Sequence, residues 1–176
     1  MKIMITGGAG FIGSHLCEEF AAKNEVIVVT RNTTTLDRIS HLLNKITLEK
    51  ADVTNYDEIG KIIEKHSPDV IIHLAGETSH SKSFENPLYD LDVNTKSTLY
   101  ILEKLKQLKL KCRFILGSTF IVIGKPQELP VTEQSICNPT TIYGANRLAS
   151  EVYCKIYHNV YDLDTITFRI TNSFGP

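Results

Sequence analysis

Thr6-Gly7-Gly8-Ala9-Gly10-Phe11-Ile12-Gly13-Ser14 is the stretch of sequence that decides the fold of this chain. It joins a short apolar run to a stretch with helical spacing, and its glycines follow the pattern G-x-x-G-x-x-G at positions 7, 10 and 13. Glycines at this spacing permit positive φ angles and let backbone amides approach a phosphate closely. A helix beginning at Phe11 would add its free N–H groups and positive dipole end. The stretch therefore predicts a pyrophosphate-binding turn, with a glycine-rich turn that has no ligand as the alternative.

The rest of the chain repeats this change from apolar run to helical stretch. The runs are rich in valine and isoleucine and lack the alternation of a half-exposed sheet, so we predict strands covered on both faces. Repeated strand–helix units indicate an α/β fold, a Rossmann-like doubly wound parallel sheet with helices on both faces. The expected strands are residues 3–6, 26–30, 46–50, 70–74, 113–116 and 165–169, and the expected helices are 11–23, 36–43, 56–66, 87–108 and 142–157.

Composition limits the classes of function. The length of 176 residues fits one domain, residues 1–176, and a net charge of −1 gives no field that would attract nucleic acid or an anionic membrane surface. No apolar run is long enough to span a bilayer and no secretory segment is evident, which points to the cytoplasm. The cysteines show no CxxC pair or metal-ligand spacing, so we expect free thiols and no metal site. They are Cys17, Cys112, Cys137 and Cys154.

One segment interrupts the strand–helix rhythm. Residues 117–139 follow the fifth expected strand. After Gly117 they contain four further residues that favour loops, namely Gly124, Pro126, Pro130 and Pro139. They therefore leave the carboxyl edge of the sheet, where open α/β sheets bind their ligands. A long loop at this edge is more often functional than idle.

The end of the second expected strand tests which dinucleotide the turn would hold. A carboxylate there would bind the adenine ribose 2′-OH and favour NAD. This chain has Thr30 and Arg31 instead, and Arg31 could pair with a 2′-phosphate. The residues thus favour NADP over NAD, with Arg31 as a solvated loop residue as the alternative.

At this point the motifs resemble those of a known family, the extended short-chain dehydrogenase/reductases, and do so in the family's order over essentially the whole chain. This family includes nucleotide-sugar epimerases, dehydratases and 4-keto reductases; UDP-galactose 4-epimerases and GDP-mannose 4,6-dehydratases are the most similar in pattern. The motifs are the glycine turn, Ala51-Asp52-Val53, His73-Leu74-Ala75-Gly76, Asn94, Gly117-Ser118-Thr119, Tyr143-Gly144-Ala145-Asn146-Arg147, and residues 169–176, which end in Asn-x-x-Gly-Pro.

The resemblance implies a set of cofactor contacts. Asp52, with Val53, would meet the adenine, although Asp52 could instead cap the helix at Tyr56. Leu74, Ala75 and Gly76 are small or apolar, as is needed where backbone runs against a flat cofactor. Asn94 resembles the family's asparagine near the cofactor, whereas alone it would suggest a solvent-facing side chain. His73 is expected to be a packed histidine at a strand end rather than a general base.

Thr119, Tyr143 and Arg147 form the predicted catalytic group. Hydride transfer at a sugar carbon needs a base for the hydroxyl proton, and a phenol of pKa about 10 needs a nearby cation to ionise at neutral pH. The family supplies a lysine four residues after the tyrosine, one helical turn away; here that position is Arg147. Tyr143 and Arg147 would also contact the cofactor, and the resemblance suggests that Ser118, Thr119 and Asn172 contact the substrate.

Two hypotheses remain open about function. The first is an NAD(P)-dependent nucleotide-sugar epimerase or 4-keto reductase. Dehydration is disfavoured because the acidic residues that the family's dehydratases carry after the position of Thr119 are replaced by Phe120 and Ile121. The second, motivated by Arg147, is a dinucleotide-binding sensor or partner-binding module without turnover. Family members continue beyond Pro176 into a substrate domain, which we expect to be absent here, and they typically form homodimers through the helices expected at 87–108 and 142–157.

Overall fold

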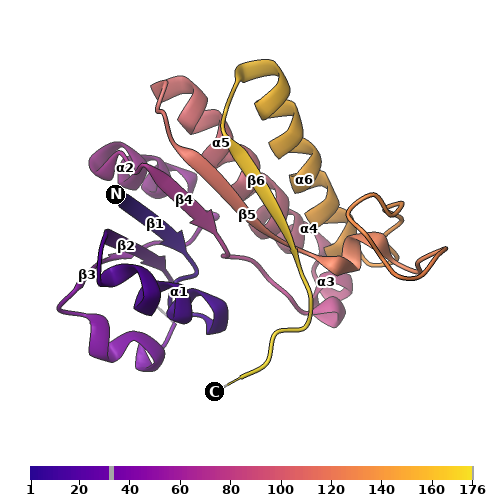
Figure 1. Cartoon of the computed structure of the whole chain (residues 1–176), viewed down its shortest axis with the longest axis horizontal. Coiled ribbons are helices and arrows are strands. Elements are labelled where there is room, and N and C mark those ends of the chain that lie inside the picture. The colour runs from indigo at the N-terminus through magenta and orange to yellow at the C-terminus, as the bar shows by residue number, and fades with distance from the viewer. Residues whose placement is uncertain (32–33, 176) are drawn as a thin grey trace.

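A six-stranded parallel sheet forms the centre of the computed structural model, which describes residues 1–31 and 34–175 (Figure 1). Asn32, which follows the second strand, and Pro176, the end of the last motif, lie outside the described residues. The strands are β1 (Lys2–Thr6), β2 (Glu25–Thr30), β3 (Ile46–Lys50), β4 (Val70–His73), β5 (Arg113–Thr119) and β6 (Thr165–Ile170). The helices are α1 (Phe11–Ala21), α2 (Tyr56–His66), α3 (His80–Glu85), α4 (Pro87–Leu91), α5 (Ser97–Leu108) and α6 (Ile142–Tyr161).

The strand order β3-β2-β1-β4-β5-β6 confirms the predicted doubly wound fold. The chain runs outward from β1 to β3, crosses back through α2, and continues outward from β4 to β6. This reversal leaves a crevice between the carboxyl ends of β1 and β4, where such folds bind ligands. The register places Thr6, the last residue of β1, beside His73, the last residue of β4.

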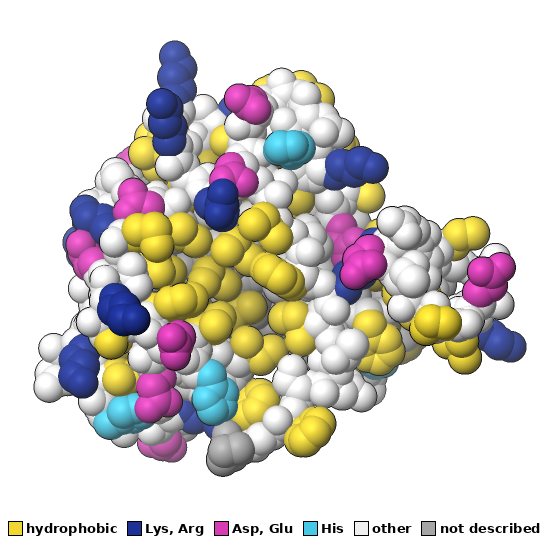
Figure 2. All heavy atoms as spheres, viewed as in Figure 1, with side chains coloured by type: hydrophobic (Ala, Val, Ile, Leu, Met, Phe, Trp, Pro, Cys, Tyr) yellow, Lys and Arg dark blue, Asp and Glu magenta, His cyan; other side chains and the backbone are white. Residues whose placement is uncertain are grey.

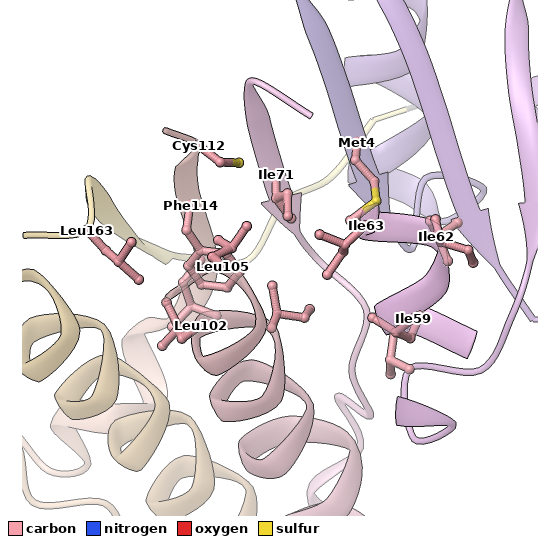
Figure 3. Close-up of a cluster of buried hydrophobic side chains, with 14 of the residues drawn as sticks. Met4, Ile59, Ile62, Ile63, Ile71, Leu102, Leu105, Cys112, Phe114 and Leu163 are labelled. Atoms are coloured by element: carbon pink, nitrogen blue, oxygen red, sulfur yellow. The ribbon is translucent and has the colours of Figure 1, made fainter. Parts of the chain in front are cut away.

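Two hydrophobic clusters, one on each face of the sheet, hold the layers together. The larger joins the sheet to α2, α5 and α6, and the smaller joins it to α1 and the 3₁₀ turn η1 (Asp37–Leu42). In Figure 3, Leu102 and Leu105 of α5 point toward Phe114 of β5, while Ile63 of α2 lies near Met4 of β1. All five side chains are fully buried. Burying each contributes about 1.5–3 kcal/mol, so packing rather than local propensity positions the helices that carry the site.

Local signals set several helix ends as expected. Asn55 caps α2 by accepting from the backbone N–H of Glu58, and acidic residues occupy the first turn of that helix. Pro87 is the first residue of α4, where its missing N–H costs nothing. The segment predicted as one helix at 87–108 contains α4 and α5 joined by a π-helical turn, η2 (Asp92–Lys96).

Other predicted boundaries were wrong. The segment at 36–43 forms the 3₁₀ turn η1 rather than an α-helix, and the short helix α3 was not predicted. The expected loop at 117–139 begins late, because β5 continues to Thr119 and a second 3₁₀ turn, η3 (Phe120–Ile123), follows. None of the helices within the described ranges is long and apolar enough to cross a bilayer.

The last strand departs from the prediction of strands covered on both faces. Its residues are only partly buried, and Phe168 is 55% exposed. In Figure 1, α5 and α6 lie behind β5 and β6, and no helix covers the side turned to the viewer. Figure 2 shows hydrophobic side chains gathered over this central part of the same face. Within the described residues, β6 is therefore an edge strand covered on one face.

Candidate functional site

A pocket of about 850 Å³ lies at the carboxyl edge of the sheet. Its wall combines the glycine turn after β1, the ends of β2, β4 and β5, the start of α6, and residues 170–173. These segments are far apart in sequence, and the strand-order reversal brings them together. The volume is within the range of about 300–1,000 Å³ that is usual for small-molecule and cofactor sites.

Two glycines of the turn, Gly7 and Gly13, cannot be replaced by a residue with a side chain without displacing backbone. Gly7 has φ +72°, and a Cβ atom there would lie 2.9 Å from the backbone nitrogen of Ala75. A Cβ atom at Gly13 would lie 2.4 Å from the carbonyl oxygen of Gly7 and 2.6 Å from Cα of Gly8. Gly10, in contrast, has only the Gly7 oxygen within reach, at 3.1 Å, and it faces the pocket. Two of the glycines therefore shape the turn, and Gly10 leaves room in front of it.

The amino end of α1 is open to an anion. The first helical bond runs from the N–H of Ser14 to the carbonyl of Gly10, so the amides of Phe11, Ile12 and Gly13 have no partner within the helix. No side chain caps this end and no acidic residue lies in its first turn. By comparison, Asn55 caps α2 and Thr141 caps α6. All three residues of the first turn of α1 line the pocket.

The ends of β2 and β3 line the part of the pocket where the sequence predicts that adenosine would bind. Thr30 is buried and Arg31 is exposed, and both line the pocket. The Arg31 guanidinium donates to the Tyr89 hydroxyl at 3.3 Å. Val53 lines the pocket, whereas Asp52 is not among the lining residues. One Asp52 carboxylate oxygen accepts from the N–H and the hydroxyl of Thr54, so this carboxylate braces the turn before α2.

After β4, the segment Leu74–Gly76 runs along the pocket. Asn94 lies behind this segment, because a Cβ atom at Gly76 would be 2.5 Å from its side-chain oxygen. Asn94 is fully buried and donates to the carbonyl of Glu77 at 3.0 Å, which excludes the alternative of a solvent-facing side chain. It is not among the pocket-lining residues, and it supports the wall from behind.

His73 is a packed histidine at the end of β4, as predicted. It is completely buried, and its ring nitrogens bond to the hydroxyls of Thr6, at 2.7 Å, and Ser97, at 3.1 Å. Burial, with a smaller contribution from the charge of Arg147, lowers the pKa of His73 to about 3. The imidazole is therefore neutral at physiological pH, and it ties β1, β4 and α5 together.

Tyr143 of α6 and Thr119 of β5 both line the pocket. Tyr143 lies in the first turn of α6 and is 6% exposed, and Thr119 is the last residue of β5. The Thr119 hydroxyl accepts from the N–H of Ile121 at 3.3 Å and thereby begins η3. The ring of His80 stacks on Tyr143 with 5.7 Å between centroids and 27° between planes. His80 also lines the pocket. It was not predicted as a site residue, because its helix α3 was not predicted.

Arg147 lies one helical turn after Tyr143 and is 4% exposed. Its Nη2 atom donates to the carbonyl of Gly117, while Nε and Nη1 have no hydrogen-bond partner among the described residues. Burial lowers the pKa of Arg147, and the groups of Tyr143, Cys154, Glu151 and Asp90 act in the opposite direction. The family's lysine position is thus occupied by a buried guanidinium that lines the pocket.

Ser118 is held in place by a carboxylate of α6. Its hydroxyl donates to Glu151 at 2.6 Å, and Glu151 also pairs with Arg169 at 2.8 Å. Ser118 and Asn172 both line the pocket. The Ser118–Glu151–Arg169 connection spans β5, α6 and β6, and spacing along the sequence gave no sign of it.

Comparison with known proteins finds a family and relatives along nearly the whole chain. The family described as GDP-mannose 4,6 dehydratase matches residues 4–176. A putative UDP-glucose 4-epimerase of Methanocaldococcus jannaschii is 34% identical over 173 residues, which cover 98% of this chain and 56% of the relative. The chain thus spans about half the length of the curated relatives it matches.

The fold of the chain is also similar to those of solved UDP-glucose 4-epimerase structures. The Thermotoga maritima UDP-glucose 4-epimerase, solved with UDP-glucose, matches with a TM-score of 0.91 and 29% identity, covering 100% of this chain and 57% of that one. The Brucella ovis UDP-glucose 4-epimerase, solved in complex with NAD, matches with a TM-score of 0.88 and 25% identity, covering 97% of this chain and 52% of that one.

Proposed function

The chain belongs to the GDP-mannose 4,6 dehydratase family of extended short-chain dehydrogenase/reductases, and on this premise we propose that it is the dinucleotide-binding and catalytic part of a nucleotide-sugar epimerase or 4-keto reductase. The observation that carries the proposal is the joint position of three features in one pocket. These are the open amino end of α1, Tyr143, and the buried guanidinium of Arg147. A binding module would have no need of a buried cation one turn from a pocket-lining phenol.

Phe120 and Ile121 favour epimerisation or reduction over dehydration. Both side chains line the pocket directly after Thr119, at positions where the family's dehydratases carry acidic residues. Removal of water needs an acid to protonate the leaving hydroxyl. Neither an aromatic nor an aliphatic side chain can supply that proton.

We propose NAD as the cofactor, with NADP as the alternative. The residues fit a dinucleotide, because Gly7 and Gly13 admit no side chain and the first-turn amides of α1 are open. Likeness to a structure in complex with NAD favours NAD. The preference for NADP predicted from Arg31 has no support among the relatives, and Arg31 is already bonded to Tyr89.

In the proposed mechanism the chain's residues position the reactants and move one proton. The first turn of α1 holds the diphosphate with backbone N–H groups, and residues 74–76 form a flat wall. Tyr143 Oη takes the proton from a sugar hydroxyl and later returns it, while the Thr119 hydroxyl holds the same sugar oxygen. Arg147 stabilises the ionised phenol, since opposite charges attract strongly in a buried site. A dinucleotide held by the glycine turn and residues 74–76 would supply hydride chemistry at the sugar carbon.

The test is turnover by the Tyr143→Phe variant. We expect turnover of UDP-, dTDP- or GDP-sugars to fall by roughly 10² or more, with the Kd for dinucleotide nearly unchanged. Tyr153→Phe is the matched control, because Tyr153 lies on the same helix but packs against the hydrophobic cluster, and it should leave turnover unchanged. Normal turnover by Tyr143→Phe would refute the catalytic assignment.

A further inference from the structure

Two buried charges of opposite sign lie close to the start of α6. Among the carboxylate, lysine and arginine side chains of the described residues, Asp90 and Arg147 are the two in the buried class, 1% and 4% exposed. A buried charge without a partner costs several kcal/mol, so proteins place such charges together or bind them through hydrogen bonds. The presence of one acid and one base therefore calls for a joint explanation.

Neither charge is fully satisfied by hydrogen bonds. Asp90 Oδ1 accepts from the side-chain amide of Asn146 at 2.7 Å, and its Oδ2 has no partner among residues 1–31 and 34–175. Arg147 uses one nitrogen on the Gly117 carbonyl and leaves Nε and Nη1 without partners there. Asn146 directly precedes Arg147, so the bond from Asn146 fastens Asp90 of α4 to the turn of α6 that carries the guanidinium.

The neighbouring carboxylates are already engaged. Glu151 binds Ser118 and Arg169, and Asp92, half-exposed at the start of η2, pairs with Lys96 at 2.6 Å. The charge of Asp90 raises the pKa of Arg147 against the effect of burial, although less than that of Glu151 does. Among the described residues, Asp90 is the buried carboxylate that makes no ion pair, and it lies across α6 from Arg147 without direct contact.

We propose that Asp90 is a positioning residue that acts through Arg147: its buried carboxylate, fastened by Asn146, is the counter-charge that holds the guanidinium beside Tyr143. The inference rests on the proposed function for the role of Arg147 in catalysis, but the pairing itself does not.

A double-mutant cycle tests the pairing by stability. Asp90→Asn and Arg147→Met each leave the other charge buried alone, so each should lower the Tm by about 6 °C or more. In the Arg147→Met background, Asp90→Asn should lower the Tm by much less or raise it. Asp92→Asn is the matched control, which removes only a half-exposed ion pair and should shift the Tm by about 2 °C or less. Additive losses of Tm would overturn the pairing.

Ligand and substrate measurements test whether Asp90 positions Arg147 or only stabilises the fold. Asp90→Asn should weaken NAD binding and lower kcat, each by about tenfold, with KM for the sugar nucleotide unchanged. In the Arg147→Met background, Asp90→Asn should change neither the Kd for NAD nor kcat further. If Asp90→Asn affects only the Tm, the positioning role is wrong. If no sugar nucleotide is turned over by the unaltered protein, the proposed function fails, while the Tm and NAD cycles still decide the role of Asp90.

Discussion

Replacing Gly13 with alanine should distort the phosphate turn and weaken dinucleotide binding. The new methyl group would lie 2.4 Å from the Gly7 oxygen and 2.6 Å from Gly8 Cα, about 1 Å inside ordinary contact, and both neighbours are backbone atoms. Gly7 cannot retreat easily, because its N–H is bonded to Val29 at 2.9 Å and its oxygen accepts from Gly10 at 2.9 Å. The backbone of the turn must therefore shift, because no flexible side chain is there to move aside.

The size of the effect follows from the groups that move. Overpacking of this kind costs about 1–3 kcal/mol of stability. A shift that breaks one hydrogen bond from a backbone N–H to a charged phosphate costs about 1.5–3 kcal/mol of binding free energy. This is about 10- to 150-fold in Kd. Gly10→Ala should behave differently, because only one atom approaches its new methyl group. It should unfold at nearly the normal temperature and still bind less tightly, since the methyl group faces the pocket.

The assay is calorimetric titration with NAD, NADH, NADP and NADPH, run beside thermal unfolding. Gly60→Ala is the control for a glycine replaced far from the pocket, because its methyl group would meet the Tyr100 hydroxyl between α2 and α5. That variant should keep its affinity for dinucleotide. A folded Gly13→Ala protein that binds all four nucleotides as the unaltered protein does would refute the assignment of the turn, and with it the proposed chemistry.

Three further outcomes are expected. Arg147→Lys should leave turnover unchanged or reduce it, measured by initial rates, because the pocket is built around a guanidinium; a site without activity would stay silent with either cation. Arg31→Ala should change the Kd for NAD by less than about twofold and should remove any preference for NADP, since a 2′-phosphate would lose its only proposed partner. For His73, whose folded pKa is about 3 and unfolded pKa 6.5, the neutral ring's contribution is complete above pH 6.5 and is lost as the pH falls toward 3, by about 1.4 kcal/mol per pH unit. Urea unfolding between pH 7 and 4 should show this slope, and His73→Asn should lack it.

Short-range sequence patterns predicted the glycine turn and the sheet that carry the site. The spacing of Gly7, Gly10 and Gly13 predicted a turn with positive φ angles and close backbone approach. The structure has positive φ at Gly7, and backbone contacts forbid a Cβ atom at Gly7 and Gly13. Strand–helix alternation predicted the doubly wound sheet, because unalternated apolar runs need cover on both faces. It failed at β6, where cover depends on which elements lie next to the edge, a property that the strand's own residues do not encode.

By itself the sequence determined that this chain has a dinucleotide-type turn, a parallel sheet, and a tyrosine followed one turn later by a cation, since each depends on residues within a few positions of one another. Only the tertiary structure decided the partners of its buried polar groups. Asn94 behind Gly76, His73 between Thr6 and Ser97, and Asp90 against Asn146 join residues 18 to 67 positions apart. A buried polar group must find a partner wherever the packed fold brings one, and sequence spacing carries no record of that neighbour.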